Sequence, residues 1–369
     1  MKIVRMGIVG SGHMGRTYSH CLRYHNTGVK LVAISGGSRG PKLASDFEIE
    51  FIPEYTHMLE RDDIDAVLLA TPHSVHAEQT ILAAKFGKHV LVEKPMMTNV
   101  ADCDAMIDSC KKANVQLSVI QTLRFRGVFR NAKKLIDQGL IGNIRAIQMT
   151  TLWKGSLYKS KNYGKWSKPW TDAVENGGFI LDRGAHCFDL LRFLTNDNAT
   201  KIFGTVNSYD VETWRSMNAM VQVNFSRGIT AQVWMSHELP DPGFPNTNDA
   251  VRIWGEKGLI QADHFGKLSV TRDGKWEDVW EMPQFEPMGE DFSATRLEAF
   301  HLQTQDFIDS LLQKRPPSVT GEDGRATIEM VEACHLSTLT GGSVSLPLPK
   351  TKGGFQFDGA TVPRNIIPG

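Results

Sequence analysis

The chain has 369 residues, with 41 Lys and Arg, 41 Asp and Glu, and 41% apolar residues. This length exceeds one hydrophobic core, so we expect two domains. The neutral charge balance argues against nucleic acid or a membrane surface as a partner, and no apolar run approaches the roughly 18 residues of a membrane span. The five scattered cysteines have no Cys-x-x-Cys spacing, which predicts reduced thiols in a cytoplasmic protein.

From residue 5 to about 122, short apolar runs alternate with helical stretches. The runs are continuously apolar, as in parallel strands that are buried on both faces. We therefore predict a doubly wound parallel sheet, a Rossmann domain, over residues 1–122. Its strands are expected at residues 6–9, 31–34, 66–70, 89–92 and 117–120.

After residue 123 the pattern changes to closely spaced strands with turn residues between them. This predicts an α+β domain over residues 123–369 with one large, mostly antiparallel open sheet. One face of such a sheet needs a cover, so we expect a homodimer or homotetramer formed through it. Strands are predicted at 144–153, 202–208, 217–225, 229–236, 251–254, 259–262, 268–271 and 277–280, and helices at 129–138, 296–313 and 325–339.

The first predicted strand leads into Gly10-Ser11-Gly12-His13-Met14-Gly15, a G-x-G-x-x-G at the start of a helix. Gly10 permits the tight turn, Gly12 lets the backbone approach a pyrophosphate, and Gly15 permits close helix packing. The helix N-terminus favours phosphate groups. Between a strand and a helix, the motif predicts that this segment, including His13 and Met14, binds NAD or NADP.

The second predicted strand ends at Ser35-Gly36-Gly37-Ser38-Arg39, where an acidic residue usually holds the ribose 2′-hydroxyl of NAD. No carboxylate here would repel a 2′-phosphate, and Ser35, Ser38 and Arg39 can bind one. We therefore favour NADP slightly over NAD. The alternative is a solvated loop with an incidental arginine.

The turn after the 66–70 strand carries Thr71, Pro72, His73 and His76. We expect this turn to contact the ribose or nicotinamide side of the cofactor. His73 and His76 have the spacing of a metal pair, but no third ligand lies near them in sequence, so no metal is expected.

The strand at 89–92 delivers Glu93-Lys94-Pro95 to its carboxyl end, where open α/β sheets bind ligands. The following proline restricts the backbone of Lys94, and the bond between them can be cis. An ammonium group held in this way can polarise or deprotonate a bound hydroxyl. We place Glu93 and Lys94 beside the cofactor; the alternative for Lys94 is a lysine that merely ends a strand.

Residues 177–189 read Gly-Gly-Phe-Ile-Leu-Asp-Arg-Gly-Ala-His-Cys-Phe-Asp and enter a predicted helix. Asp182 and His186 are four residues apart and project from one face of that helix. A histidine accepts protons near neutral pH, and a neighbouring carboxylate can orient it. The alternative is that Asp182 caps the helix and His186 is a core residue.

In this order, the motifs resemble those of the glucose–fructose oxidoreductase/inositol dehydrogenase (Gfo/Idh/MocA) family. The similarity extends through Arg124-Phe125, Gly139-x-Ile141-Gly142 and Gly321-Glu322-Asp323-Gly324, and so covers most of the chain. The chain departs from the family pattern in lacking the strand-2 carboxylate, and in Thr122, where many relatives carry asparagine.

The resemblance implies an NAD(P)-dependent oxidoreductase that acts on a small sugar, cyclitol or glycoside. It also implies that Lys94, Asp182 and His186 line the substrate site. His186 would take the hydroxyl proton, Lys94 would stabilise the alkoxide, and Asp182 would orient the histidine or hold a second hydroxyl. Members of the family differ over whether lysine or histidine is the acid–base group.

Aromatic and lysine residues are dense between Trp153 and Trp170, and such faces suit carbohydrate rings. We expect Trp153, Lys154, Tyr163, Trp166 and Arg124 to bind substrate; a loop packed at a subunit contact is the alternative for the aromatic stretch. Two other functions stay open. Some relatives oxidise substrate transiently with a tightly bound nucleotide, in glycoside cleavage or sugar–sugar hydride transfer, and others are non-enzymatic sensors.

Overall fold

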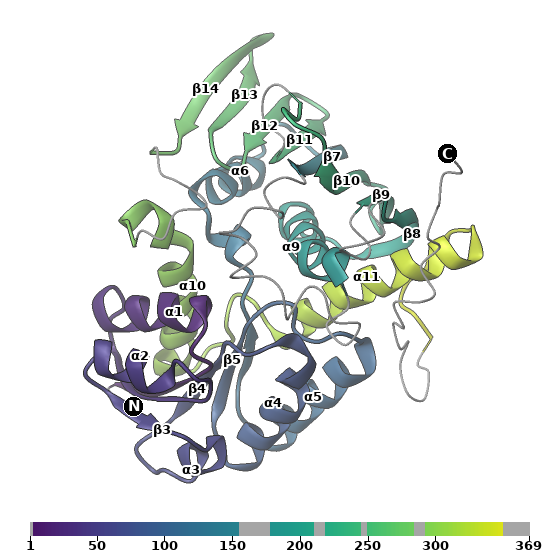
Figure 1. Cartoon of the computed structure of the whole chain (residues 1–369). Coiled ribbons are helices and arrows are strands. Elements are labelled where there is room, and N and C mark those ends of the chain that lie inside the picture. The colour runs from purple at the N-terminus through teal and green to yellow at the C-terminus, as the bar shows by residue number, and fades with distance from the viewer. Residues whose placement is uncertain (1–2, 155–177, 210–217, 245–248, 284–291, 350–369) are drawn as a thin grey trace. The chain divides into compact units, whose positions relative to one another are not determined.

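The computed structural model describes residues 3–154, 178–209, 218–244, 249–283 and 292–349 (Figure 1). Contacts divide the chain into two compact units, each described here by itself. Unit 1 consists of Met1–Phe125 and Phe285–Ala326, and unit 2 of Arg126–Gln284 and Thr327–Gly369. Within the described ranges, no helix is long and apolar enough to cross a membrane.

Unit 1 contains a six-stranded sheet in the order β3-β2-β1-β4-β5-β6, and all its pairs are parallel. Almost every residue of β4, β5 and β6 is buried, as the continuous apolar runs predicted. The three-residue strand β3 was not predicted, because so short a strand shows no period. The strands are β1 (Val4–Val9), β2 (Val29–Ser35), β3 (Glu50–Ile52), β4 (Ala66–Leu69), β5 (His89–Val92) and β6 (Leu117–Val119).

The strand order of unit 1 reverses at β1, which pairs with β2 on one side and with β4 on the other. Such a reversal opens a crevice at the carboxyl ends of the strands, and ligands of doubly wound folds bind there. The connecting helices are α1 (His13–Tyr24), α2 (Gly40–Asp46), α3 (Tyr55–Leu59), α4 (His76–Lys85) and α5 (Val100–Lys112), with 3₁₀ turns η1 (His73–Val75) and η2 (Thr122–Phe125).

Helix α10 (Ala294–Gln313) packs with unit 1 by its contacts, although it lies within the stretch 123–369 that was predicted as the second domain. Its Phe307, Ile308 and Leu311 join the core formed by β1, β2 and α1. The amide of Gln303 donates to the carbonyl of Val119 and accepts from the N–H of Gln121, both at 2.8 Å. The chain returns to unit 1 because this face of α10 completes its core.

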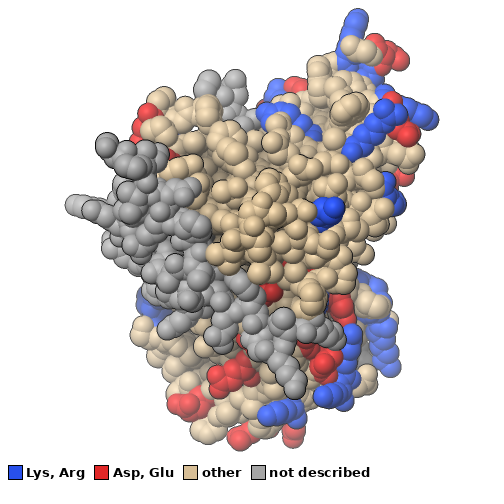
Figure 2. Space-filling model, turned by 90° about the vertical axis from the view of Figure 1, so that its right-hand side faces the viewer, with Lys and Arg blue, Asp and Glu red and all other residues tan. Residues whose placement is uncertain are grey.

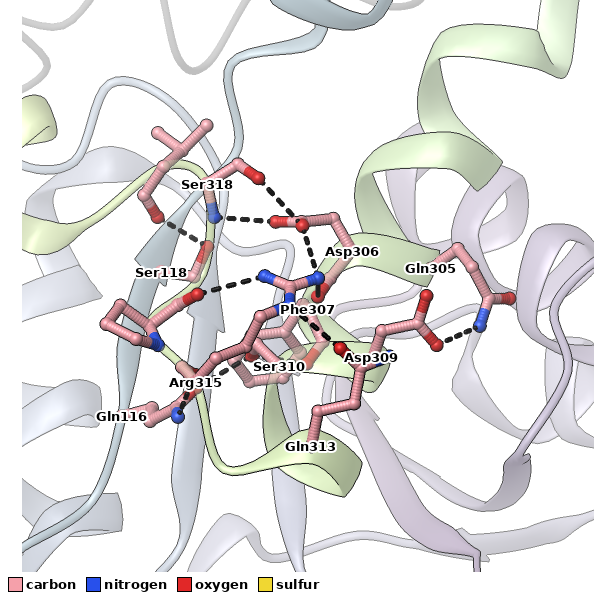
Figure 3. A network of polar contacts seen from close by, with 12 residues as sticks. Gln116, Ser118, Gln305, Asp306, Phe307, Asp309, Ser310, Gln313, Arg315 and Ser318 are labelled. Carbon is pink, nitrogen blue, oxygen red and sulfur yellow. Dashed lines mark hydrogen bonds and ion pairs between the residues drawn. The ribbon is translucent and has the colours of Figure 1, made fainter.

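A polar network fastens the carboxyl end of α10 to β6 and to the chain that follows it (Figure 3). The carboxylate of Asp306 accepts from Arg315 at 2.8 Å and from both the N–H and the hydroxyl of Ser318 at 2.7 Å. Ser118 of β6 donates to the carbonyl of Val319 at 2.8 Å. These bonds hold the segment that follows α10 against β6, which gives the network a structural role.

Unit 2 contains a nine-stranded sheet in the order β14-β13-β12-β11-β7-β10-β9-β8-β15. Only the pairing of β7 with β10 is parallel, so the predicted mostly antiparallel sheet is confirmed. The strands are β7 (Ile144–Lys154), β8 (Ala199–Asn207), β9 (Asn218–Phe225), β10 (Thr230–Leu239), β11 (Asp249–Gly255), β12 (Leu259–Asp263), β13 (Lys267–Arg272), β14 (Lys275–Glu281) and β15 (Val344–Ser345).

The two faces of the unit 2 sheet differ sharply in burial. Along β7, Ile147, Met149 and Thr151 are buried, whereas Gln148 between them is exposed. Helix α9 packs on the buried inner face, which positions its side chains over β7 and β11. The helices of unit 2 are α6 (Gly127–Asp137), α9 (Gly178–Thr195) and α11 (Gly321–Thr340), which begins in unit 1.

Candidate active site

The fingerprint glycines of unit 1 lie where the predicted dinucleotide turn requires them. Gly10 has a φ of 107°, and a Cβ there would lie 2.4 Å from the carbonyl oxygen of Ala70. A Cβ at Gly15 would lie 2.1 Å from the carbonyl oxygen of Gly10. A Cβ at Gly12 would lie 3.8 Å from Nη2 of Arg39, its nearest neighbour in space, so room remains in front of the N-terminus of α1. A diphosphate fits such an open N-terminus, whereas Met14 beside it packs partly on the core.

The loop after β2 exposes Ser38 and Arg39 but not Ser35. Ser35 is buried, and its hydroxyl has no hydrogen-bond partner within the described residues. The prediction that Ser35 contacts a 2′-phosphate is therefore not supported by its placement. Arg39 faces Gly12, and no acidic side chain lies in the loop from 35 to 39.

The turn after β4 is held within the protein. The hydroxyl of Thr71 donates to the side chain of Gln79 at 2.6 Å, and His73 is buried. His76 is fully buried: Nε2 lies 3.0 Å from the carbonyl of Thr71, and Nδ1 lies 3.1 Å from that of Pro95. His76 therefore links two turns, and its burial gives no support to the predicted contact with the cofactor.

The turn that carries Lys94 is fixed by a buried carboxylate. Glu93 accepts from the hydroxyl of Tyr18 at 2.6 Å and from the backbone N–H of Lys94 at 2.7 Å. Burial and the neighbouring Glu93 raise the pKa of Tyr18 well above its usual range, so the phenol keeps its proton and donates. The Lys94–Pro95 bond is cis, and Lys94 itself is half-buried. Glu93 is therefore bonded to α1 through Tyr18 and to its own turn through the N–H of Lys94. The contribution of Tyr18 to fixing this turn was not predicted from sequence.

Arg124 lies in an ion pair rather than in an open polar pocket. Its guanidinium is 3.2 Å from Asp323, and both side chains are largely buried. It also donates to the carbonyl of Ser318 at 3.3 Å. These contacts fasten η2 to the start of α11 and account for Arg124 structurally, so its predicted substrate contact loses support.

In unit 2, Asp182 and His186 are half-buried on α9, and a buried ion pair beside them anchors the helix. Arg183 donates to the hydroxyl of Thr151 and to the carboxylate of Asp249, both at 2.7 Å. Burial alone would raise the pKa of Asp249, but the charge of Arg183 and the hydrogen bond of His264 lower it to about 2. The pair fixes the rotation of α9 about its axis. Arg183 was not predicted as a site residue, although it stands inside the motif.

Trp153 at the end of β7 contacts this anchor. Its ring lies 5.3 Å from the guanidinium of Arg183 and 5.8 Å from the ring of His237. The neighbouring Lys154 pairs with Asp241 at 3.1 Å. The other two aromatic residues predicted to bind substrate, Tyr163 and Trp166, lie outside the described residues.

Metal ligands do not gather in the described part of the chain. No group of three or more His, Cys, Asp or Glu side chains there is arranged to hold a metal ion. The spacing of His73 and His76 has another explanation, because both ring nitrogens of His76 lie close to backbone carbonyls, at 3.1 Å from that of Pro95 and 3.0 Å from that of Thr71.

The parallel sheet, the glycine turn at its strand-order reversal and the lysine-bearing turn at β5 define a dinucleotide-binding fold. Residues 4–121 match the profile of an oxidoreductase family with an NAD-binding Rossmann fold, and residues 133–346 match the α/β C-terminal domain of the same family. The chain belongs to the Gfo/Idh/MocA oxidoreductase family, as the sequence motifs predicted.

Similar proteins span nearly the whole chain. Myo-inositol 2-dehydrogenase of Thermotoga maritima is 26% identical, over 93% of this chain and 98% of its own. A 2,7-anhydro-N-acetylneuraminate hydratase of Mediterraneibacter gnavus is 26% identical, over 94% and 97%. The structure of aldose-aldose oxidoreductase from Caulobacter crescentus, complexed with glycerol, aligns with a TM-score of 0.78 and 23% identity, over 93% of this chain and all of that one.

Proposed function

We propose that this oxidoreductase transfers a hydride between a nicotinamide cofactor and a secondary hydroxyl or ketone of a sugar, cyclitol or glycoside. The observation that carries the proposal is the Lys94 turn, which a buried carboxylate holds at the ligand-binding end of a dinucleotide-binding sheet. The name of the Thermotoga relative, an inositol dehydrogenase, supports the substrate class.

Three side chains have distinct roles in the proposed reaction. The bound nicotinamide supplies the hydride acceptor or donor. Lys94 stabilises the developing alkoxide, and His186 takes the hydroxyl proton as the general base. Asp182 orients the histidine or holds a second hydroxyl, while Trp153 offers an apolar ring face to the substrate. Reduction uses the same groups in reverse.

We also propose that the enzyme prefers NADP over NAD. Ser38 and Arg39 are exposed at the end of β2, and Arg39 faces Gly12. A guanidinium binds a phosphate through charge-assisted hydrogen bonds, and the loop has no carboxylate to oppose it. This support comes from Arg39 and Ser38 alone, because Ser35 is buried.

A second candidate function is transient oxidation with a nucleotide that is not released. The names of two similar proteins support it, because neither a hydratase reaction nor oxidoreduction between two aldoses produces net reduced nicotinamide. In that case reduced nicotinamide would form and be consumed in each cycle. A sugar sensor on the same fold is disfavoured, because a sensor needs neither Lys94 nor His186 as proton-transfer groups.

We propose that two or four copies associate through the outer face of the unit 2 sheet. Phe203, Met220 and Trp254 are each about half exposed on that face. Between them, the amides of Gln148, Gln232 and Gln222 form a row across paired strands. Figure 2 views the side on which β8 lies, where charged side chains are sparse over a broad area of unit 2. If this face is the interface, Met220→Asp should lower the mass measured by light scattering.

A cytoplasmic location is also proposed, on the basis of the thiols. All five cysteines are free and buried, and burial raises the pKa of the Cys187 thiol to about 12. Such thiols are unreactive and need no oxidising compartment.

The experiment that tests the function is a panel of sugars, polyols and cyclitols, each assayed with NAD and NADP. Growth of the reduced-nicotinamide absorbance with stoichiometric ketone supports the dehydrogenase. Loss of substrate without net reduced cofactor, together with cofactor that copurifies, supports the second candidate. Ligand binding with no chemistry would contradict both.

A further inference from the structure

Arg296 of α10 reaches the dinucleotide turn from the far end of the sequence. It lies in the first turn of α10, whose N-cap residue Ser293 accepts from its backbone N–H. Its side chain is 93% buried, since only 7% of the residue is exposed. Nη2 of Arg296 lies 2.7 Å from Nε2 of His13, and its guanidinium carbon lies 5.8 Å from the ring centre of Phe292.

This contact fixes which nitrogen of His13 carries a proton. A guanidinium has donors only, so Nε2 of His13 must accept with its lone pair. The imidazole is therefore neutral, with its hydrogen on Nδ1. Burial, then the charges of Arg296 and Arg39, lower the pKa of His13 to about 4. The ring stays neutral throughout the physiological pH range.

His13 stands where the diphosphate of a dinucleotide is expected. It is the first residue of α1 and follows Gly12, the fingerprint glycine with open space in front of it. The first turn of α1 has no acidic residue. The described charged groups acting on His13 are Arg296 from α10 and Arg39 from the loop after β2, while Arg16 of α1 is paired with Asp46 at 2.7 Å.

We propose that Arg296 is a positioning residue of the cofactor site: it holds His13 in the Nδ1–H form, so that the imidazole donates to the diphosphate of the bound dinucleotide. The positive charge of Arg296 also favours the anionic ligand. This inference rests on dinucleotide binding by the fingerprint, and not on the substrate or on the roles of Lys94 and His186.

The test uses the full-length protein with ¹⁵N-labelled histidine. In the parent, the His13 ring should give the shifts of a neutral Nδ1–H imidazole from pH 8 down to about pH 5. In Arg296→Met, which keeps the length of the stem, the ring should change to the commoner Nε2–H form. Its pKa should rise, because one of the charges that lower it is gone.

Cofactor affinity is measured in parallel by calorimetry with NADP and NAD. Arg296→Met should weaken the binding of both about tenfold, the effect of one charge-assisted hydrogen bond. Affinity of the variant should then recover between pH 7 and 5, as His13 becomes a cation, whereas the parent should show no such recovery. Arg296→Lys, which keeps a donor and the charge, should restore most of the affinity.

Two results would overturn the inference. One is an Nε2–H imidazole at His13 in the parent, and the other is unchanged affinity in Arg296→Met with a changed ring form. If Arg296→Met proves unstable by thermal melting, His13→Gln replaces it, and its full affinity would count equally against the proposal. A protein that binds cofactor as described but oxidises no sugar would contradict the proposed function and leave this inference standing.

Discussion

In unit 1 the groups proposed to bind the cofactor come from short motifs at the carboxyl ends of parallel strands. In unit 2 the candidate groups stand on one helix, α9, whose rotation is set by Arg183 bonds to residues 32 and 66 positions away. The first arrangement is local in sequence, and a single substitution there should affect one contact. The second depends on distant partners, so a single substitution should affect folding and activity together.

The largest expected effect is on turnover, and we expect a loss of similar size from a substitution in either unit. Lys94→Ala in unit 1 and His186→Ala in unit 2 should each lower kcat by roughly 10² to 10⁴, through lost acid–base and alkoxide stabilisation. Cofactor affinity should persist in both. The matched controls are Lys85→Ala and His57→Ala, at exposed positions of unit 1. Near-normal turnover in both active-site variants would remove the catalytic assignment.

The next effect separates the two arrangements. Arg183→Met leaves the carboxylate of Asp249 buried without its cation, which should cost about 3–5 kcal/mol of unfolding free energy. Urea unfolding measures this cost, and kcat should fall as α9 loses its anchor. Arg192→Met is the control on the same helix, because its bond to Asn198 is exposed. Adding Asp249→Leu should recover much of the loss, since a buried pair replaced by apolar groups is often neutral.

The same contrast explains what could be predicted from sequence. The glycine turn, the strands of unit 1 and the Lys94 turn were predictable because contiguous residues determine them. The partners of Glu93 and Arg124 were not predictable from sequence. Tyr18 is 75 residues from Glu93, and Asp323 is separated from Arg124 by more than half of the chain. Helix α10 carries an ordinary helical period, and nothing in that period says which sheet it covers.

Acid should destabilise both units through neutral buried histidines. Burial lowers the pKa of His13 to about 4, with help from Arg296 and Arg39, and burial lowers that of His335 in unit 2 to about 3. Both folded-state values lie below 6.5, so the unfolded chain binds more protons as the pH falls below 6.5, and stability is lost there. At pH 5 each histidine should cost about 2 kcal/mol relative to pH 8.

Unfolding free energies at pH 8, 6.5 and 5 measure this loss. His335→Leu, which removes the titrating group from unit 2, should show a shallower decline with pH than the parent does. An identical decline in the variant would place the proton uptake elsewhere.

A smaller effect is expected at Arg39, and it tests whether this one residue after β2 determines the preference for NADP. Arg39→Ala should raise the KM for NADP about tenfold and leave the KM for NAD nearly unchanged, because only the 2′-phosphate needs that cation. Arg23→Ala, at an exposed arginine on α1, is the control. Equal effects on the two cofactors would refute the proposed preference for NADP.

The smallest effect lies at Tyr18, where the Lys94 turn of unit 1 relies on a partner that is distant in sequence. Tyr18→Phe keeps the ring, which meets Phe300 edge-on at 5.9 Å, but removes the hydroxyl that donates to Glu93. The buried carboxylate then loses its phenol donor, which should cost about 1–3 kcal/mol of stability. The N–H of Lys94 still holds the turn, so kcat should fall only several-fold.

Tyr24→Phe, exposed on the same helix, should change neither quantity. The comparison of these two variants therefore measures how far the orientation of Lys94 depends on α1. If kcat in Tyr18→Phe equals that of the parent while stability falls, the turn is set by its own backbone alone, and unit 1 is local in function as well as in sequence.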